Sequence, residues 1–227
     1  NKRVFVKEIK FKGNYSVPDA VLRKKMQLKE KWLFNSGFFN EEELKSDLER
    51  VAVYYKSQGY MNIKIGSADI RYGRRNEFVS ITVPVEEGPQ YITGIIEIEG
   101  NELFPTAEIK EVFLLNEGDI FSQEKLLYDQ SNIKGYYAER GYIFSIVRLS
   151  TYINEETNII DVPYHIKENE LAYVEKIMIR GNTRTKDKVI RRNLTVKPLE
   201  PFNGKKLQRS KEKLHKLNYF SEIEFNT

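Results

Sequence analysis

Hydrophobic and polar residues follow two different periods along the first 88 residues of the chain. Residues 4–11 alternate with a period of two, which predicts a half-buried strand, and Gly13-Asn14 ends it. Apolar residues three and four apart then predict two helices, with Ser16 and Asn40 as their N-caps. Two further alternating runs predict two more strands joined by a turn. In chain order, a strand, two helices and two strands are predicted at residues 4–11, 16–29, 40–59, 61–72 and 78–85.

The same order of elements occurs twice more. Each predicted first strand ends in Gly-Asn, at Gly13, Gly100 and Gly181, and Tyr-x-x-x-Gly-Tyr closes the second helix of the first two copies. In the third copy Asn218 replaces that glycine, and Asn is the next-best residue for the left-handed conformation that ends a helix. Two markers with one spacing predict three repeats of roughly 80 residues. The expected domains are residues 1–88, with a helix–helix loop insertion at 31–39, then 89–169 and 170–227.

The third repeat is shorter than the other two. The second repeat is predicted to have its elements at residues 91–99, 107–115, 123–140, 145–153 and 159–167, and the third at residues 173–179, 186–194, 203–217 and 221–225. Asn203 is the expected N-cap of its second helix. The last strand is therefore missing from the third repeat. In the complete repeats we expect that strand to pair with both others at the centre of the sheet, so the two remaining strands need water or another chain.

This plan is an α+β fold of tandem units. Each complete unit is expected to be a three-stranded mixed sheet with two antiparallel helices on one face. We interpret the sequence as a fragment of a longer protein, because the third repeat is truncated and the chain begins without a start Met or a signal peptide.

Composition and motifs argue against catalysis. The absence of cysteine excludes zinc ribbons, thiol enzymes, iron–sulfur proteins and disulfide-stapled modules. His165 and His215 are the only histidines and lie in different repeats, without carboxylate spacing that suggests a metal site or a triad. No glycine-rich nucleotide loop and no nucleophile elbow occurs. We expect no enzyme activity, no cofactor and no metal.

The charge of the chain leaves one alternative of another class. The 37 Lys and Arg residues exceed the 33 Asp and Glu residues, a formal net charge of +4, and basic residues gather at 184–192 and 205–216. Tandem α/β units with a basic surface also occur among RNA-binding proteins. The sequence lacks the signatures of those folds, so a solvated basic face or a surface for an acidic partner is favoured, and no nucleic-acid partner is expected.

The insertion at 31–39 is unusually aromatic for a loop. It contains the only tryptophan of the chain, and its aromatic residues are Trp32, Phe34, Phe38 and Phe39. One interpretation is that these rings fold back over the helices as additional core. The other is that they form an exposed apolar contact for a protein or a membrane surface.

These features resemble those of POTRA domains, the periplasmic part of BamA-type outer-membrane assembly proteins. The resemblance rests on I-x-I-x-G-N after the first strand, Y-x-x-x-G-Y at the close of the second helix, and the insertion in the first repeat. The three repeats resemble the third, fourth and fifth POTRA domains. Related translocation-and-assembly proteins and two-partner-secretion transporters remain alternatives within the family.

The resemblance implies a binding scaffold at the periplasmic face of the bacterial outer membrane. The implied partners are unfolded outer-membrane β-barrel proteins, a periplasmic chaperone, accessory assembly lipoproteins and a C-terminal membrane β-barrel of the same chain. Clients would bind by β-augmentation, in which an extended segment adds to an exposed strand edge. The expected client-binding edge is Ile63, Lys64, Ile65, Gly66, Ser67, Ala68, Asp69 and Ile70. The alternative is an edge that is merely protected from aggregation.

The resemblance also implies a lipoprotein-docking site on the first helix of the third repeat. Arg191 lies at a basic contact position of that helix, with Arg192 beside it. The acidic contact expected about two turns later is not preserved, because Lys197-Pro198 occupies that stretch.

Overall fold

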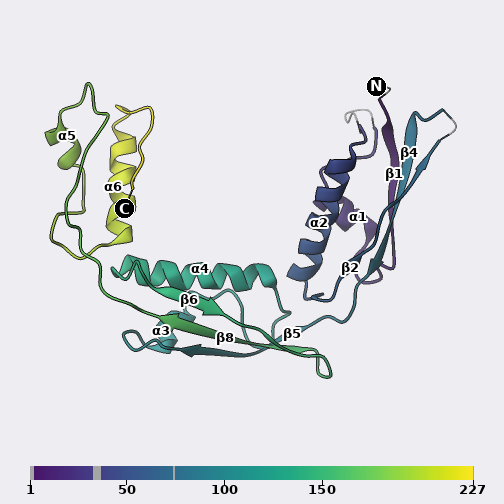
Figure 1. The fold of residues 1–227 in the computed structure, drawn as a ribbon, viewed down its shortest axis with the longest axis horizontal. Coiled ribbons are helices and arrows are strands. Elements are labelled where there is room, and N and C mark those ends of the chain that lie inside the picture. Colours follow the sequence, from purple (N-terminus) through teal and green to yellow (C-terminus); the bar gives the residue numbers. More distant parts are fainter. Residues whose placement is uncertain (1–2, 33–36, 74, 227) are drawn as a thin grey trace. The chain divides into compact units, whose positions relative to one another are not determined.

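A computed structural model describes residues 3–32, 37–73 and 75–226. Contacts divide the chain into two compact units. The first comprises Asn1–Ile95, Leu115–Leu126 and Tyr152–Asp161, and the second comprises Ile96–Leu114, Leu127–Thr151 and Val162–Thr227. The boundary between them passes through the second repeat, so the domain limits expected from the sequence stay a prediction. Each repeat is described by itself below (Figure 1).

The first repeat forms a mixed sheet whose last strand is central. Its elements are β1 (Phe5–Lys12), α1 (Asp19–Lys25), α2 (Glu41–Ser57), β2 (Lys64–Ile65), β3 (Asp69–Tyr72) and β4 (Phe78–Glu86). Strand β4 pairs in parallel with β1 on one side and antiparallel with β2 and β3 on the other. The central position predicted for the last strand is confirmed.

One face of this sheet is covered by the two helices (Figure 1). Alternate residues of β4, among them Val79 and Ile81, are fully buried against Leu22 of α1 and against Val51 and Tyr55 of α2. Burying a side chain of this size stabilises the fold by about 1.5–3 kcal/mol. The alternation along β4 therefore decides which face of the sheet meets the helices.

Helix α1 is shorter than the sequence predicts at both ends. It begins at Asp19 with Pro18, and not Ser16, in the N-cap position, and the Ser16 amide donates to the Glu87 carboxylate at 3.0 Å. It ends at Lys25 rather than at residue 29. The amides of Gln27 and Leu28 donate to the buried carboxylate of Asp47 on α2, each at 2.7 Å, and this pairing draws the chain out of the helix.

The start of α2 is confirmed. The Asn40 side chain accepts hydrogen bonds from the amides of Glu42, at 2.9 Å, and Glu43, at 3.2 Å. Both amides belong to the first turn, which has no partners within the helix.

The second repeat has the same plan. Its elements are β5 (Ile92–Glu99), α3 (Thr106–Lys110), α4 (Gln123–Glu139), β6 (Ile146–Leu149), β7 (Tyr152–Asn154) and β8 (Ile159–Lys167), and β8 is the central strand. Helix α3 ends at Lys110 rather than at residue 115. Four residues later the Leu114 amide donates to the Asp129 carboxylate on α4, at 2.6 Å, so the chain leaves the helix here much as it does after α1.

The third repeat keeps its helices and lacks its sheet. Helix α5 (Asp187–Arg191) is followed by α6 (Gly204–Lys216), whose predicted cap Asn203 is confirmed by a 2.9 Å hydrogen bond from the Lys206 amide. The strands predicted at residues 173–179 and 221–225 are wrong. Neither segment is a strand, apart from one bridge between Tyr173 and Pro201. Residues 172–226 contain no strand that lies between these two segments.

Within residues 3–32, 37–73 and 75–226, no helix combines the length and the apolar character needed to cross a membrane.

Candidate functional site

The expected client-binding edge of the first repeat is interrupted. The sequence predicts one strand over residues 61–72, whereas the structure has β2 and β3 separated by Gly66, Ser67 and Ala68. Ile65 lies opposite Val85 and Asp69 lies opposite Thr82, so four steps along the edge match three along β4. This extra residue is a β-bulge.

A proline in the central strand lies opposite the bulge. The carbonyl oxygen of Pro84 accepts a hydrogen bond from the Gly66 amide at 2.9 Å, so it faces the edge. The nitrogen of a strand residue points to the same side as its own carbonyl, and proline has no N–H to donate there. Proline is tolerated in a central strand at such a bulge. The residues that interrupt the edge therefore lie on two strands.

The register shows which amides of the edge point outward. The Gly66 and Gly73 amides donate to carbonyls of β4, and the groups of successive strand residues point to alternate sides. Asp69 and Arg71 therefore face β4, whereas the amides of Ile65, Ile70 and Tyr72 point away from it. These three outward amides are positioned to pair with an added strand.

The side chains of the edge divide between core and solvent. Ile63, Ile65, Ala68 and Ile70 pack against the hydrophobic core of the first repeat. Lys64 and Asp69 are exposed, and the Lys64 ammonium lies 3.5 Å from the Glu86 carboxylate. Exposed pairs of this kind contribute little to stability. An added strand could bond the main chain here without removing a core side chain.

The opposite edge of the same sheet is already occupied. The amides of Ile9 and Phe11 on β1 donate to the carboxylates of Glu30, at 2.9 Å, and Asp19, at 3.2 Å. Nearer the start of β1, the Val6 amide donates to the Gly37 carbonyl at 2.8 Å. Sequence reasoning missed this shielding, because the acceptors lie in the α1–α2 region rather than on a strand.

The aromatic insertion contributes to that shielding. The Phe39 amide donates to the Val4 carbonyl at 2.9 Å, and the Phe38 ring stacks on Phe5 with centroids 5.2 Å apart. The Phe39 side chain packs against the core, whereas Trp32 is 77% exposed. Phe34 lies outside the described residues. The insertion thus covers one end of β1 and presents Trp32 to solvent.

Arg191 has a structural contact within the third repeat. Its guanidinium donates to the Ile177 carbonyl at 3.1 Å and lies 3.4 Å from the Asp187 carboxylate. Arg23 of α1 makes the same contact in the first repeat, donating to the Ile9 carbonyl at 3.0 Å. The repetition indicates that Arg191 helps to hold its helix on the adjacent segment. Arg192 is exposed, and docking at both arginines stays a prediction.

The comparisons with known proteins agree with the repeat plan. A family model described as POTRA, surface antigen variable number repeat, matches residues 4–88, 91–169 and 172–227. The chain belongs to the POTRA family. Over 99% of its length it is 32% identical to the outer membrane protein assembly factor BamA of Neisseria meningitidis serogroup B, of which it covers 29%. Over 98% of its length it is 30% identical to a putative outer membrane protein assembly factor of Treponema pallidum, of which it covers 27%.

A solved structure has the same fold. The crystal structure of Haemophilus influenzae BamA POTRA3-5 matches with a TM-score of 0.75 and 23% identity, covering 98% of this chain and 89% of that one. The predicted α+β fold of tandem POTRA units is confirmed. The chain is a BamA-type POTRA region, periplasmic and attached to the outer membrane.

These matches also bear on the other classes of function. POTRA proteins are scaffolds or assembly factors rather than known enzymes. The described parts of the POTRA units contain no group of three or more His, Asp or Glu residues arranged to hold a metal ion. The RNA-binding alternative finds no support among the matches. The chain spans less than a third of the length of the two relatives named above.

Proposed function

We propose that this POTRA chain is a periplasmic binding scaffold of an outer-membrane β-barrel assembly machine, and that it receives unfolded clients at the β2–β3 edge. The client's extended chain would pair with the outward amides of Ile65, Ile70 and Tyr72. The identity to outer membrane protein assembly factors supports the scaffold role.

The choice of the β2–β3 edge over the β1 edge rests on the direction of the main-chain amides. Amides of β1 donate to Glu30, Asp19 and Gly37, all within the first repeat. The register of β2 and β3 instead directs three amides away from β4. A client strand needs such main-chain donors, because main-chain hydrogen bonds provide its affinity. The β2–β3 edge is therefore the better surface for augmentation.

The remaining partners belong to the same proposal. A periplasmic chaperone would deliver the client, accessory lipoproteins would dock near Arg191 and Arg192, and a C-terminal membrane β-barrel would receive the client. Both arginines are exposed, and Arg191 also donates to the Ile177 carbonyl, whereas Arg192 makes no such contact within the described hydrogen bonds.

The test removes an outward amide and leaves the sheet intact. In Ile70→Pro and Ile65→Pro, each proline deletes a donor that points away from β4. A photo-crosslinking residue at the exposed Tyr72 reports contact with an unfolded β-barrel protein. We expect each variant to crosslink at least tenfold less client, while circular dichroism shows an unchanged fold.

The matched control is Ile153→Pro in β7 of the second repeat. The Ser150 amide donates to the Pro163 carbonyl of β8, so by alternation the amides of Tyr152 and Asn154 face β8 and the Ile153 amide points outward. This variant should crosslink as much client at Tyr72 as the unmodified chain. Unchanged crosslinking in both Ile65→Pro and Ile70→Pro, with the fold intact, would show that the edge is not the client site.

A further inference from the structure

We propose that the first repeat contains a docking site for an acidic segment of a partner protein, in a basic groove beside β1. The groove lies at the opposite end of the strand order from the β2–β3 edge. Lys7 and Lys24 would bind carboxylates of the segment, and Trp32 would cover one of its aromatic or apolar side chains. The segment would be held by its side chains and not by pairing of main chains, so this site does not depend on the proposed client edge.

The groove is a hollow of about 390 Å³, here called the β1 groove. It is lined by Lys7, Ile9, Ala20, Arg23, Lys24 and residues 28–32. Ile9 and Leu28 are almost fully buried, so they lie at the bottom of the hollow, whereas Trp32 is 77% exposed. A side chain that protrudes from a partner can reach these apolar groups, and a flat bilayer surface cannot.

Basic side chains predominate around the β1 groove. Its lining has one carboxylate, that of Glu30, against the five basic residues Lys7, Arg23, Lys24, Lys29 and Lys31. A concave surface with one sign of charge focuses the electric field and attracts groups of the opposite sign. Charge complementarity therefore favours an acidic occupant.

Three of the five basic side chains have partners within the first repeat. The Arg23 guanidinium lies 3.9 Å from the Glu30 carboxylate, and the Lys29 ammonium donates to the Arg23 carbonyl at 2.9 Å. The Lys31 ammonium lies 3.6 Å from the centre of the Phe5 ring, a cation–π contact. These contacts hold the walls of the β1 groove in place.

Lys7 and Lys24 are the basic residues that remain for a partner. Both are exposed, and in the described part of the chain neither takes part in an ion pair or a side-chain hydrogen bond. Glu30 is engaged elsewhere, because it accepts from the Ile9 amide at 2.9 Å and lies beside Arg23. A carboxylate that enters the hollow is partly removed from water, so its attraction to an ammonium exceeds that of a fully exposed pair.

The other repeats show that the fold does not require this lysine pair. Counted from the glycine after the first segment, Arg23 corresponds to Arg191, which makes the same contact with a carbonyl. The equivalents of Lys7 are Gly94 and Glu175, and those of Lys24 are Glu111 and Arg192. Neither of the other repeats has a basic residue at both positions. Arg23 thus has a structural role that the repeats share, whereas the lysine pair is particular to the first repeat.

The contacts along β1 define how the occupant is recognised. The amides of Ile9 and Phe11 already donate to the carboxylates of Glu30 and Asp19, so a partner cannot add a strand at these positions. Recognition is therefore by side chains, with one carboxylate for each free lysine. The exposed ring of Trp32 provides a surface on which an aromatic side chain can stack. The occupant is an acidic segment with an aromatic residue close to its carboxylates.

The test uses the full chain and a set of synthetic peptides without tryptophan. Each peptide has one phenylalanine and two glutamates, and the spacing of the glutamates differs from one peptide to the next. Isothermal titration calorimetry measures affinity, and we expect the best peptide to have a dissociation constant below about 1 mM. Trp32 is the only tryptophan of the chain, so its emission should shift to shorter wavelength when the peptide covers it. Glutamines in place of the glutamates should abolish binding, and added salt should weaken it several-fold.

A pair of double variants separates the β1 groove from general attraction by charge. Lys7→Gln with Lys24→Gln should weaken peptide binding at least tenfold and leave the hydrogen exchange of β1 unchanged. The matched control is Lys12→Gln with Lys45→Gln, which removes the same charge from exposed positions of β1 and α2 outside the groove. It should bind within twofold of the unmodified chain. Ile70→Pro at the β2–β3 edge should also bind the peptide normally, so the two proposed sites can fail separately.

Four results would overturn the proposal. Absence of binding by every peptide of the set would show that the groove takes no such segment. Equal losses in the two double variants would show that the net charge of the chain, and not the groove, attracts the peptide. Tighter binding of phosphatidylglycerol vesicles, lost in Lys7→Gln with Lys24→Gln, would assign the lysines to a membrane surface. Tighter binding of an RNA oligonucleotide with the same loss would assign them to a nucleic acid.

Discussion

The first and third repeats contain the same local motifs, yet only the first has a sheet. In both, the outer side of the first segment is bonded to the loop between the helices, by Lys31 to the Val6 carbonyl and by Leu199 to the Val174 carbonyl. In both, an asparagine after the glycine binds the aspartate that opens the first helix, through Asn14 and Asn182. These contacts therefore form without a central strand.

The strands, in contrast, form only where the central strand is present. Residues 5–12 form β1 beside β4, whereas residues 174–180 have the same alternation and form no strand. Ile9 is fully buried in the first repeat, and Ile177, its equivalent beside the arginine contact, is half-buried in the third. The difference shows that alternation determines which side chains can face a core, while pairing with a neighbour makes the segment a strand.

The largest loss of stability should come from substituting the glycine that follows the first segment of a repeat. Gly13→Ala adds a Cβ 2.1 Å from the Val85 carbonyl oxygen, so β4 must shift, and it also places alanine at φ +92°. We expect the first repeat to lose roughly 3–5 kcal/mol of unfolding free energy, from strain and overpacking together. Gly181→Ala should cost only the backbone strain, about 1–2 kcal/mol, because a Cβ there meets nothing within 4 Å. Hydrogen exchange followed as a function of denaturant measures the first and the third repeat separately. Equal losses in Gly13→Ala and Gly181→Ala would show that the contact with β4 does not cause the larger effect in the first repeat.

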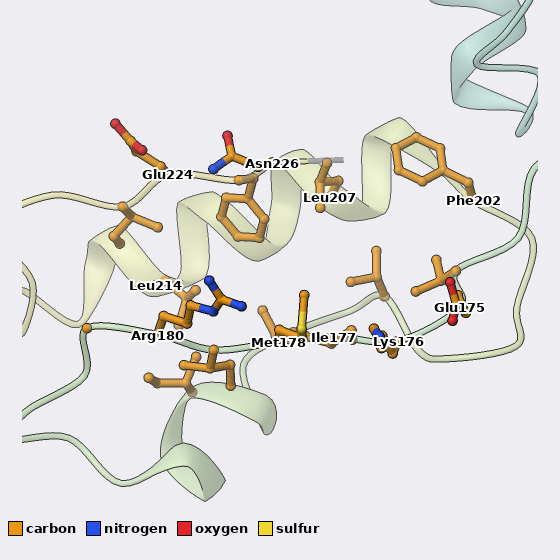
Figure 2. A pocket seen from close by; sticks show the side chains of 18 of the residues that line it. Glu175, Lys176, Ile177, Met178, Arg180, Phe202, Leu207, Leu214, Glu224 and Asn226 are labelled. Atoms are coloured by element: carbon orange, nitrogen blue, oxygen red, sulfur yellow. The ribbon is translucent and has the colours of Figure 1, made fainter.

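The next effect concerns Ile9 and its equivalent Ile177 in the third repeat. Ile9→Ala creates a cavity in a closed core, so we expect a loss of about 2–5 kcal/mol in the first repeat. Ile177→Ala removes the same atoms beside an open hollow (Figure 2), so it should cost no more than about 1 kcal/mol. Hydrogen exchange in each repeat measures both losses. A loss above 2 kcal/mol at Ile177 would contradict the open hollow.

A smaller effect is expected at high pH. Burial, with hydrogen bonding to Glu108, raises the pKa of Tyr136 to about 12, and burial with a bond to Glu168 raises the pKa of Tyr137 above its usual range. The unfolded chain has a tyrosine pKa of about 10. The stabilisation is thus complete below pH 10, and it declines as the pH rises through the folded values. We expect the second repeat to lose stability between pH 10 and 12.

The variant Tyr136→Phe checks this assignment. It should flatten the alkaline decline of the second repeat, measured as urea midpoints between pH 9 and pH 12. The third repeat has Leu214 in place of the deeper tyrosine, so hydrogen exchange there should not show this contribution. A decline of the same size in Tyr136→Phe would assign the pH dependence to other groups.

Local signals allowed much of the fold to be predicted, and distant partners account for the rest. The caps Asn40 and Asn203 act on amides two or three residues away, so the sequence predicts them. The end of α1 depends on Asp47 of another helix, and the break in the β2–β3 edge depends on Pro84 of another strand. Neither of these two contacts can be inferred from the periodicity of apolar residues along the chain.

The candidate site shows the same division. The position of the edge could be predicted from strand order alone, and the outward amides of Ile65 and Ile70 required the register. The shielding of β1 by Glu30 and Asp19 could not be predicted, because a carboxylate in a helix or loop gives no signal that it will bond a strand.

The smallest effect should occur at the residue that ends the second helix. Asn218 has φ +52°, and Gly59 has φ +87° at the same place in the first repeat. A Cβ at Gly59 would lie 2.9 Å from the Tyr91 carbonyl oxygen and from an Ile120 methyl group, so Gly59→Asn should cost about 1–3 kcal/mol. Asn218→Gly should change the stability of the third repeat by only a few tenths of a kcal/mol, because both residues accept the left-handed conformation. Hydrogen exchange of residues 204–217 measures the second change. A loss above 1 kcal/mol would mean that the Asn218 side chain does more than permit the turn, and that glycine and asparagine are not equivalent ends for this helix.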